Sequence, residues 1–151
     1  MAAKEKWTRA ASDVLGQQVL DVVPVARKKP GAAPCYVAGV AVFAAVVFLH
    51  EFGVVPGPTI VAYFLGALPM AVLFQMAADL VFVAATPSGL QVLEGSRWNP
   101  TPQPPALGPL DPALVRGPMG LLRNSYDVGG RTHQVGWKHK GRFEQMLAAA
   151  R

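Results

Sequence analysis

The chain has 151 residues, of which 52% are hydrophobic and only 15% are charged, and its net charge is +5. An average soluble domain carries about a quarter charged residues, so the deficit indicates a lipid-facing segment. The basic residues are spread over the chain without a nucleic-acid-binding motif. The single cysteine, Cys35, excludes an intramolecular disulfide and a cysteine-rich metal cluster.

Residues 1–31 are polar and amphipathic. Apolar residues recur at roughly helical spacing and leave a polar side, which predicts a helix over residues 7–25. Ser12 is the expected N-cap and Pro24 the expected stop, because proline has no N–H with which to continue a helix. The predicted helix carries both acidic and basic residues, and this mixed charge favours packing on a neighbouring domain over lying in the membrane interface. We therefore predict a cytoplasmic amphipathic N-terminal segment.

Residues 32–79 form an apolar run whose only acidic or basic side chains are His50, Glu51 and Asp79. A glycine- and proline-rich turn at 53–58 divides this run into halves of about twenty residues, the length that a helix needs to cross about 30 Å of hydrocarbon. The pattern predicts a transmembrane hairpin with spans at about 33–52 and 58–78. Its many glycines and alanines favour close helix packing, either inside the hairpin or against another membrane protein, and the sequence leaves both open.

The basic residues next to the spans predict the orientation of the hairpin. Arg27, Lys28 and Lys29 directly precede the first span, and the connecting turn has no lysine or arginine. The positive-inside rule therefore predicts that both termini are cytoplasmic. The bias towards alanine, valine, proline, glycine and arginine is typical of a high-GC bacterial genome, so we expect a multi-pass protein of a bacterial plasma (inner) membrane.

Residues 80–151 are expected to form a small cytoplasmic β domain. Strand-like segments at 80–85 and 90–94 flank a turn at 86–89, and segments at 121–128 and 131–137 flank Gly129-Gly130, a type I′ turn dipeptide. Between them, residues 99–112 contain six prolines, which predicts a loop rather than a regular strand or helix. Residues 141–151 are predicted to close the chain as a helix with Phe143, Met146, Leu147 and Ala150 on one face.

This order of parts resembles small bacterial two-span membrane proteins with a pleckstrin-homology-like cytoplasmic domain. The likeness rests on residues 83–92 around the turn at 86–89, and on residues 129–135 with the basic run and helix behind them. It implies a membrane α+β fold, in which a small antiparallel sheet with a C-terminal helix follows the hairpin. A complete domain of this kind has more strands than residues 80–151 accommodate, because the proline-rich stretch replaces central strands. The resemblance carries over no lipid-headgroup motif.

Two places carry candidate functional side chains. A basic cluster with an aromatic residue, comprising Trp137, Lys138, His139, Lys140 and Arg142, lies where the predicted sheet meets the final helix. It suits contact with anionic lipid headgroups or with a partner, and the alternative is a solvated loop with Trp137 in a small core. Asp79, at the cytoplasmic end of the second span, is a candidate membrane charge site. Its alternative is an interfacial ion pair with Arg27 or Lys28.

The motifs favour a protein that is not an enzyme. The sequence shows no nucleophile motif, phosphate-binding glycine loop or zinc-type ligand spacing, and it implies no catalytic residue, cofactor or metal. The leading hypothesis is a membrane scaffold or accessory subunit, whose hairpin packs on partner helices and whose β domain makes protein contacts. The alternative is a membrane-surface module that binds anionic lipid. The expected partners are the bilayer and other membrane subunits, with no nucleic acid and no small-molecule substrate.

Overall fold

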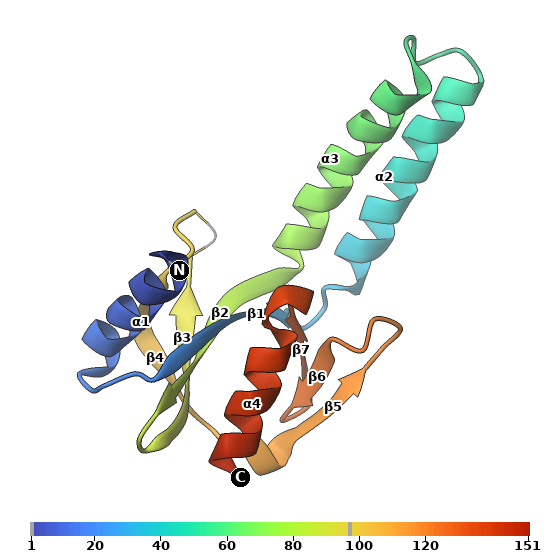
Figure 1. The fold of residues 1–151 in the computed structure, drawn as a ribbon. Coiled ribbons are helices and arrows are strands. Elements are labelled where there is room, and N and C mark those ends of the chain that lie inside the picture. The colour runs from blue at the N-terminus through green and yellow to red at the C-terminus, as the bar shows by residue number, and fades with distance from the viewer. Residues whose placement is uncertain (1, 97) are drawn as a thin grey trace. The chain divides into compact units, whose positions relative to one another are not determined.

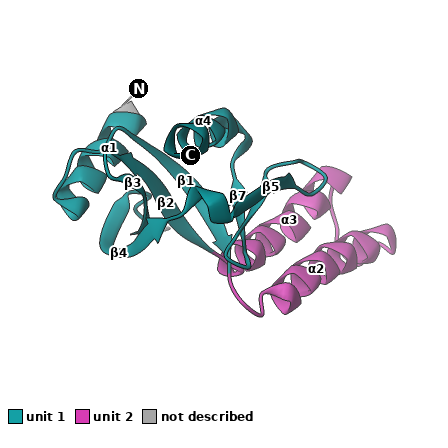
Figure 2. Cartoon of the chain, turned by 90° about the horizontal axis from the view of Figure 1, so that it is seen from below, with its two compact units in different colours: residues 1–28, 79–151 teal, residues 29–78 magenta. Residues whose placement is uncertain are grey.

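The structure, a computed structural model, describes residues 2–96 and 98–151. The described chain divides into two compact units, which Figure 2 colours separately. The hairpin unit comprises residues 29–78. The sheet unit comprises the chain up to Lys28 and from Asp79 onward. The apolar hairpin is therefore inserted into the β domain, and the N-terminal segment belongs to that domain.

The hairpin unit contains two apolar helices joined by a turn, α2 (Ala33–Glu51) and α3 (Thr59–Met76), as Figure 1 shows. Within the described residues, these two are long and apolar enough to cross a membrane, with 19 and 18 residues and mean hydropathies of 2.0 and 1.8. Their bounds match the predicted helices within the usual uncertainty of helix ends. His50 stabilises the turn, because its Nδ1 lies 2.9 Å from the Val55 carbonyl O and its Nε2 lies 3.3 Å from the Thr59 hydroxyl O.

Glycines allow the two helices to approach each other. A Cβ added at Gly39 would lie 2.9 Å from Cε1 of Phe74. A Cβ added at Gly66 would lie 3.0 Å from Cδ2 of Phe43 and 3.3 Å from its Cα. Both glycines are buried, whereas Ala44 on α2 is exposed. The packing inside the hairpin thus uses the glycines and leaves an alanine-bearing face of α2 uncovered.

The sheet unit contains an antiparallel sheet flanked by two α-helices. In the part of the chain that the structure describes, its strands stand in the order β4-β3-β2-β1-β7-β6-β5. The elements are α1 (Ala2–Leu15), β1 (Asp21–Lys28), β2 (Ala78–Thr86), β3 (Gly89–Gly95), β4 (Pro102–Leu110), the 3-10 helix η1 (Pro112–Leu114), β5 (Val115–Met119), β6 (Ser125–Val128), β7 (Arg131–Val135), the 3-10 helix η2 (Trp137–His139) and α4 (Lys140–Ala150).

Each face of the sheet carries a buried apolar cluster. On the face covered by α4, the buried cluster comprises Val23, Val25, Val81, Val83, Leu90, Leu110, Val115, Tyr126, Val135, Phe143, Met146 and Leu147. On the face covered by α1, it comprises Ala11, Val19, Val22, Phe82, Ala84 and Leu93. Consecutive residues of β1 and β2 alternate between the two clusters, because successive side chains of a strand point to opposite faces.

The predicted helix over residues 7–25 begins earlier, at Ala2, and is wrong beyond Leu15. Its predicted boundaries are wrong as well, because Ser12 lies inside α1 and Pro24 lies in β1. The helix ends at Leu15 because Gly16 adopts φ +63°, a conformation that favours glycine, and its N–H donates to the Ser12 carbonyl O at 2.9 Å. The following segment is β1, in which Val22 and Val23 are both fully buried. A strand buried on both faces has no polar side, so its apolar run does not show the two-residue alternation that identifies a strand.

The predicted loop over residues 99–112 is also wrong, because Pro102–Leu110 forms strand β4. In the described chain this strand lies at the edge of the sheet, where its one neighbouring strand is β3. An edge strand needs hydrogen bonds on one side only, and it therefore tolerates proline. Its register with β3 shifts on either side of Leu93, which accommodates the proline-rich sequence.

The remaining strands and the final helix agree better with the sequence. The two predicted β-hairpins are present as β2–β3 and β6–β7, and Gly129 and Gly130 have the positive φ of a type I′ turn, 57° and 82°. Helix α4 buries Phe143, Met146 and Leu147 as predicted. Strand β5 was not predicted. The sheet thus gains β1, β4 and β5 over the sequence-based expectation, and β1 comes from the N-terminal segment rather than from residues 80–151.

Candidate functional site

The predicted basic cluster spans η2 and the first turn of α4. Trp137 is 79% exposed, and it does not fill the core of the sheet unit. The Nζ of Lys138 lies 5.6 Å from the centroid of the Trp137 ring, within the range of a cation–π contact. Trp137 and Lys138 therefore form an accessible pair with an apolar ring and a positive charge.

The other members of the cluster have partners inside the fold. Lys140 Nζ lies 3.9 Å from Oε1 of Glu144, one turn further along α4. The His139 ring packs edge-on against Trp7 of α1, with ring centroids 5.9 Å apart. Burial, with the nearby positive charges of Arg142 and Lys138, lowers the pKa of His139 below its ordinary value. The lowered pKa favours the neutral form of His139 over the charged form.

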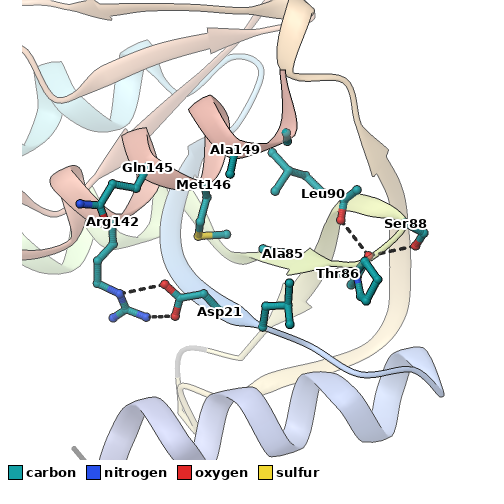
Figure 3. Close-up of a pocket in the computed structure, with 13 residues that line it drawn as sticks. Asp21, Ala85, Thr86, Ser88, Leu90, Arg142, Gln145, Met146 and Ala149 are labelled. Carbon is teal, nitrogen blue, oxygen red and sulfur yellow. Dashed lines mark hydrogen bonds and ion pairs between the residues drawn. The ribbon is translucent and has the colours of Figure 1, made fainter.

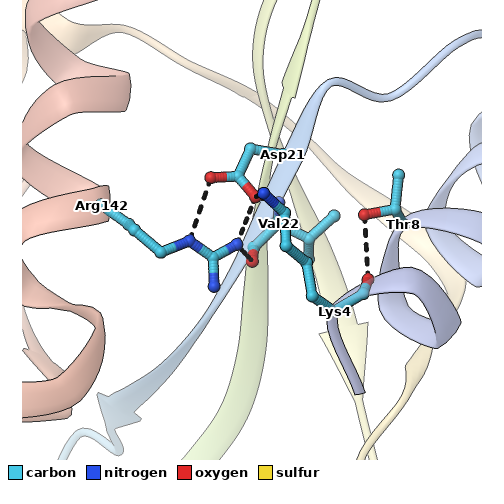
Figure 4. Close-up of polar contacts among 5 residues, drawn as sticks. All are labelled: Lys4, Thr8, Asp21, Val22 and Arg142. Atoms are coloured by element: carbon cyan, nitrogen blue, oxygen red, sulfur yellow. Dashed lines mark hydrogen bonds and ion pairs between the residues drawn. The ribbon is translucent and has the colours of Figure 1, made fainter. Parts of the chain in front are cut away.

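Arg142 joins α4 to β1 through Asp21 (Figure 4). Its Nε donates to Asp21 Oδ2 at 3.1 Å, and its Nη2 donates to Asp21 Oδ1 and to the Val22 carbonyl O. Lys4 of α1 adds a charge, with its Nζ 3.4 Å from Asp21 Oδ1. Partial burial opposes ionisation of Asp21. Hydrogen bonds from Arg142 and the Val22 N–H, and the charges of Arg142 and Lys4, outweigh this, so the pKa of Asp21 is lowered.

We expect Asp21→Asn to lower the free energy of unfolding at pH 7 by about 1–2 kcal/mol, because it removes a charge-assisted pair that is only partly exposed. Because the pKa of Asp21 is lowered in the folded state, its contribution is present above the unfolded-state pKa of about 3.9. It is lost as the pH falls through the folded-state pKa. Denaturant unfolding in detergent micelles from pH 7 to pH 3 measures this, with Asp13→Asn, an exposed acid of α1, as the control. An equal loss at both ends of this range would contradict the prediction.

A groove of about 530 Å³ lies between Leu20, directly before β1, the β2–β3 turn and α4 (Figure 3). Several of its polar groups bond to one another: the Thr86 hydroxyl donates to the Gly89 carbonyl O at 2.8 Å and lies 2.9 Å from the Ser88 hydroxyl, and Arg142 binds Asp21. The groove therefore combines apolar side chains with polar groups that are largely engaged within the fold. Sequence reasoning missed it, because its walls come from segments far apart in the chain.

Asp79 lies in β2, beyond the end of α3 at Met76. Its carboxylate Oδ2 is 3.8 Å from Nη2 of Arg27 in the neighbouring strand β1. The ion pair with Arg27 that the sequence suggested is thus present within the sheet unit. The structure places the candidate membrane charge at the start of a strand and not inside an apolar helix.

The β5–β6 turn exposes two adjacent leucines that sequence reasoning assigned to a strand. Leu121 is 99% exposed and Leu122 is 78% exposed. The N–H of Arg123 donates to the Gly120 carbonyl O at 3.0 Å and closes the turn around them. The signal available in the sequence was an apolar pair next to a glycine and an arginine.

The outer face of α2 carries a shallow depression of about 440 Å³, lined by Tyr36, Val37, Val40, Ala41 and Ala44. It lies on the hairpin unit and is bounded by aromatic and aliphatic side chains. Val37 is 69% exposed and Val40 is 55% exposed. We call this surface the alanine face.

The fold and these surfaces define a class of protein, an antiparallel sheet domain with an inserted pair of apolar helices long enough to span a membrane. Within the described residues, no group of three or more histidine, cysteine, aspartate or glutamate side chains is placed to hold a metal ion. Comparison of the chain with protein-family models, curated proteins and solved structures gave no match. The function proposed below therefore rests on the residues of this chain alone.

Proposed function

We propose that this protein is a non-enzymatic accessory subunit or scaffold of a larger membrane complex. The hairpin unit crosses the bilayer, the alanine face of α2 packs against a partner helix, and the sheet unit makes protein contacts on the cytoplasmic side. The observation that carries the proposal is the alanine face itself. Gly39 and Gly66 lie in the α2–α3 contact, while Ala41 and Ala44 are left exposed in a shallow depression, where small side chains let a second helix approach closely.

The exposure of the two helices supports insertion into a bilayer. In the most apolar windows of α2 and α3, only 6% and 11% of the residues are buried, whereas the core helix of a soluble protein is mostly buried. Large side chains such as Ile60, Phe64 and Leu68 are 64–65% exposed. In water these surfaces would form an apolar patch that soluble monomers avoid, and in hydrocarbon their exposure carries no penalty.

The positions of the basic residues support a cytoplasmic sheet unit. Arg27 and Lys28 end β1 directly before the hairpin unit, and the turn between α2 and α3 has no basic residue. Under the positive-inside rule both chain termini then lie in the cytoplasm, here of a bacterium. An antiparallel sheet followed by α4 also supports the pleckstrin-homology-like interpretation of the sheet unit, a fold that serves here as an interaction module.

A matched pair of substitutions on α2 tests the proposal. Ala44 lies in the alanine face, and its neighbour Ala45 is equally small and exposed but points about 100° away. We expect the tagged wild type, extracted from its native membrane in mild detergent, to bring down membrane partners in fixed ratio. Ala44→Leu should lose these partners and Ala45→Leu should retain them, as measured by quantitative mass spectrometry. Recovery of the wild type alone, or equal loss in both variants, would contradict the proposal.

A second candidate function is a membrane-surface module that binds anionic lipid. The accessible pair of Trp137 and Lys138 favours it, because an amphipathic ring beside a cation suits the headgroup region. Recovery of the protein with lipid and without protein partners would bring this function to first place.

A further inference from the structure

We infer that one edge of the sheet unit, formed by the β5–β6 turn and η2, docks onto an anionic bilayer surface, with Leu121 and Leu122 entering the interface. This inference deepens the proposed function and rests on its membrane-spanning hairpin. It concerns a second, peripheral contact with lipid.

The turn and η2 lie side by side although they are apart in the sequence. Ser125 at the start of β6 pairs with Gln134 near the end of β7. The N–H of Val135 donates to the carbonyl O of Asn124 at 2.9 Å. The β5–β6 turn, before Asn124, and η2, after Val135, therefore lie at the same end of strands β6 and β7. This end of the strands is the edge of the sheet unit named above.

This edge gathers exposed apolar side chains. Leu121, Leu122 and Trp137 are 99%, 78% and 79% exposed, and Met119 before the turn is 42% exposed. The N–H of Arg123 donates to the Gly120 carbonyl O and closes the turn, and the high exposure of the two leucines places their side chains mostly in solvent. Moving these exposed leucine side chains out of water into an apolar environment lowers the free energy.

The charge of the edge identifies an anionic lipid surface as the occupant. Arg123 follows the leucines and Lys138 follows Trp137, while residues 117–124 and 136–141 contain no aspartate or glutamate. Protein surfaces at the bilayer interface typically carry tryptophan and basic residues around apolar side chains. The tryptophan rings lie at the level of the headgroups, and the cations contact anionic lipid. The hairpin holds the sheet unit next to such a surface at high effective concentration, so a small contact is sufficient.

The test uses the full chain with Cys35→Ala and a single new cysteine, Leu121→Cys, labelled with an environment-sensitive fluorophore. Leu114→Cys is the matched control, because Leu114 is also exposed but lies at the opposite end of β5. Both proteins are reconstituted in vesicles of phosphatidylcholine alone and of phosphatidylcholine with phosphatidylglycerol. In the anionic vesicles we expect the emission of the label at 121 to shift to shorter wavelength and to be quenched by nitroxide lipids. The label at 114 should keep the emission of an aqueous environment and should not be quenched.

Charge reversal provides a second measurement. Arg123→Glu and Lys138→Glu alter exposed positions, and we expect each to reduce the quenching of the label at 121, as should high salt. Retention of the chain after alkaline carbonate washing reports separately on the hairpin. A label at 121 that stays in water while the chain remains in the membrane would overturn this inference and leave the proposed function standing. Shielding of the label only by a co-purified protein would overturn it as well, and loss of the chain from the membrane would remove both.

Discussion

Phe143→Ala is expected to lower the free energy of unfolding of the sheet unit by about 3–5 kcal/mol, the usual cost of removing a buried phenylalanine. Phe143 is 1% exposed and meets the Tyr126 ring edge-on, with centroids 4.9 Å apart. It is the aromatic residue by which α4 enters the core. Whole domains are stable by only about 5–15 kcal/mol, so this loss is a large share of the total.

Denaturant unfolding of the full chain in detergent micelles, followed by the near-ultraviolet signal of the sheet unit, measures the effect of Phe143→Ala. Gln145→Ala is the control, because Gln145 lies on the exposed side of the same helix. We expect that control to stay within about 0.5 kcal/mol of the wild type. A loss below about 1 kcal/mol for Phe143→Ala would mean that α4 does not anchor this face of the sheet.

Gly66→Leu is expected to separate α2 from α3. A Cβ at this position would already lie 3.0 Å from the Phe43 ring and 3.3 Å from its backbone, and the remaining atoms of leucine have no space without displacing α2. Overpacking of this kind costs about 1–3 kcal/mol. We place Gly66→Leu at the upper end of this range, because the obstacle includes backbone as well as a side chain.

The separation is measured between spin labels on the native Cys35 at the start of α2 and on Met76→Cys at the end of α3. We expect the distance distribution to broaden and lengthen in Gly66→Leu. Ala71→Leu, an exposed position on α3, should leave it unchanged. An unaltered distribution in Gly66→Leu would show that helix packing in the hairpin does not depend on this glycine.

The contacts around Arg142 show why the candidate site was only partly predictable. A cluster of basic residues from 137 to 142 is visible in the sequence, but the partner of Arg142 is Asp21, at the other end of the chain. His139 packs on Trp7, which is equally remote. The sequence near residues 137–142 does not indicate which of its basic side chains form an ion pair with, or pack against, a residue far away in the chain. The structure therefore divides one predicted cluster into fold contacts and the exposed pair of Trp137 and Lys138.

The strands missed by the sequence have a common cause. β1 is buried on both faces and therefore lacks alternation, and β4 tolerates its prolines because it lies at an edge. Position in the sheet decides both, and that position is a tertiary property. The short strand β5 lies at the other edge and, among the residues described, pairs with β6 alone; its own residues carry no strong strand signal.

The apolar hairpin, the Gly129-Gly130 turn and the final helix follow from the sequence alone. Span length, turn conformation and helix periodicity are local properties, each set within about twenty consecutive residues. The tertiary structure alone decided that the N-terminal segment supplies a central strand and that the hairpin interrupts the sheet unit. It also decided which cations remain accessible. These outcomes depend on which distant segments pack together, and burial of both sheet faces, rather than any local preference, selects that arrangement.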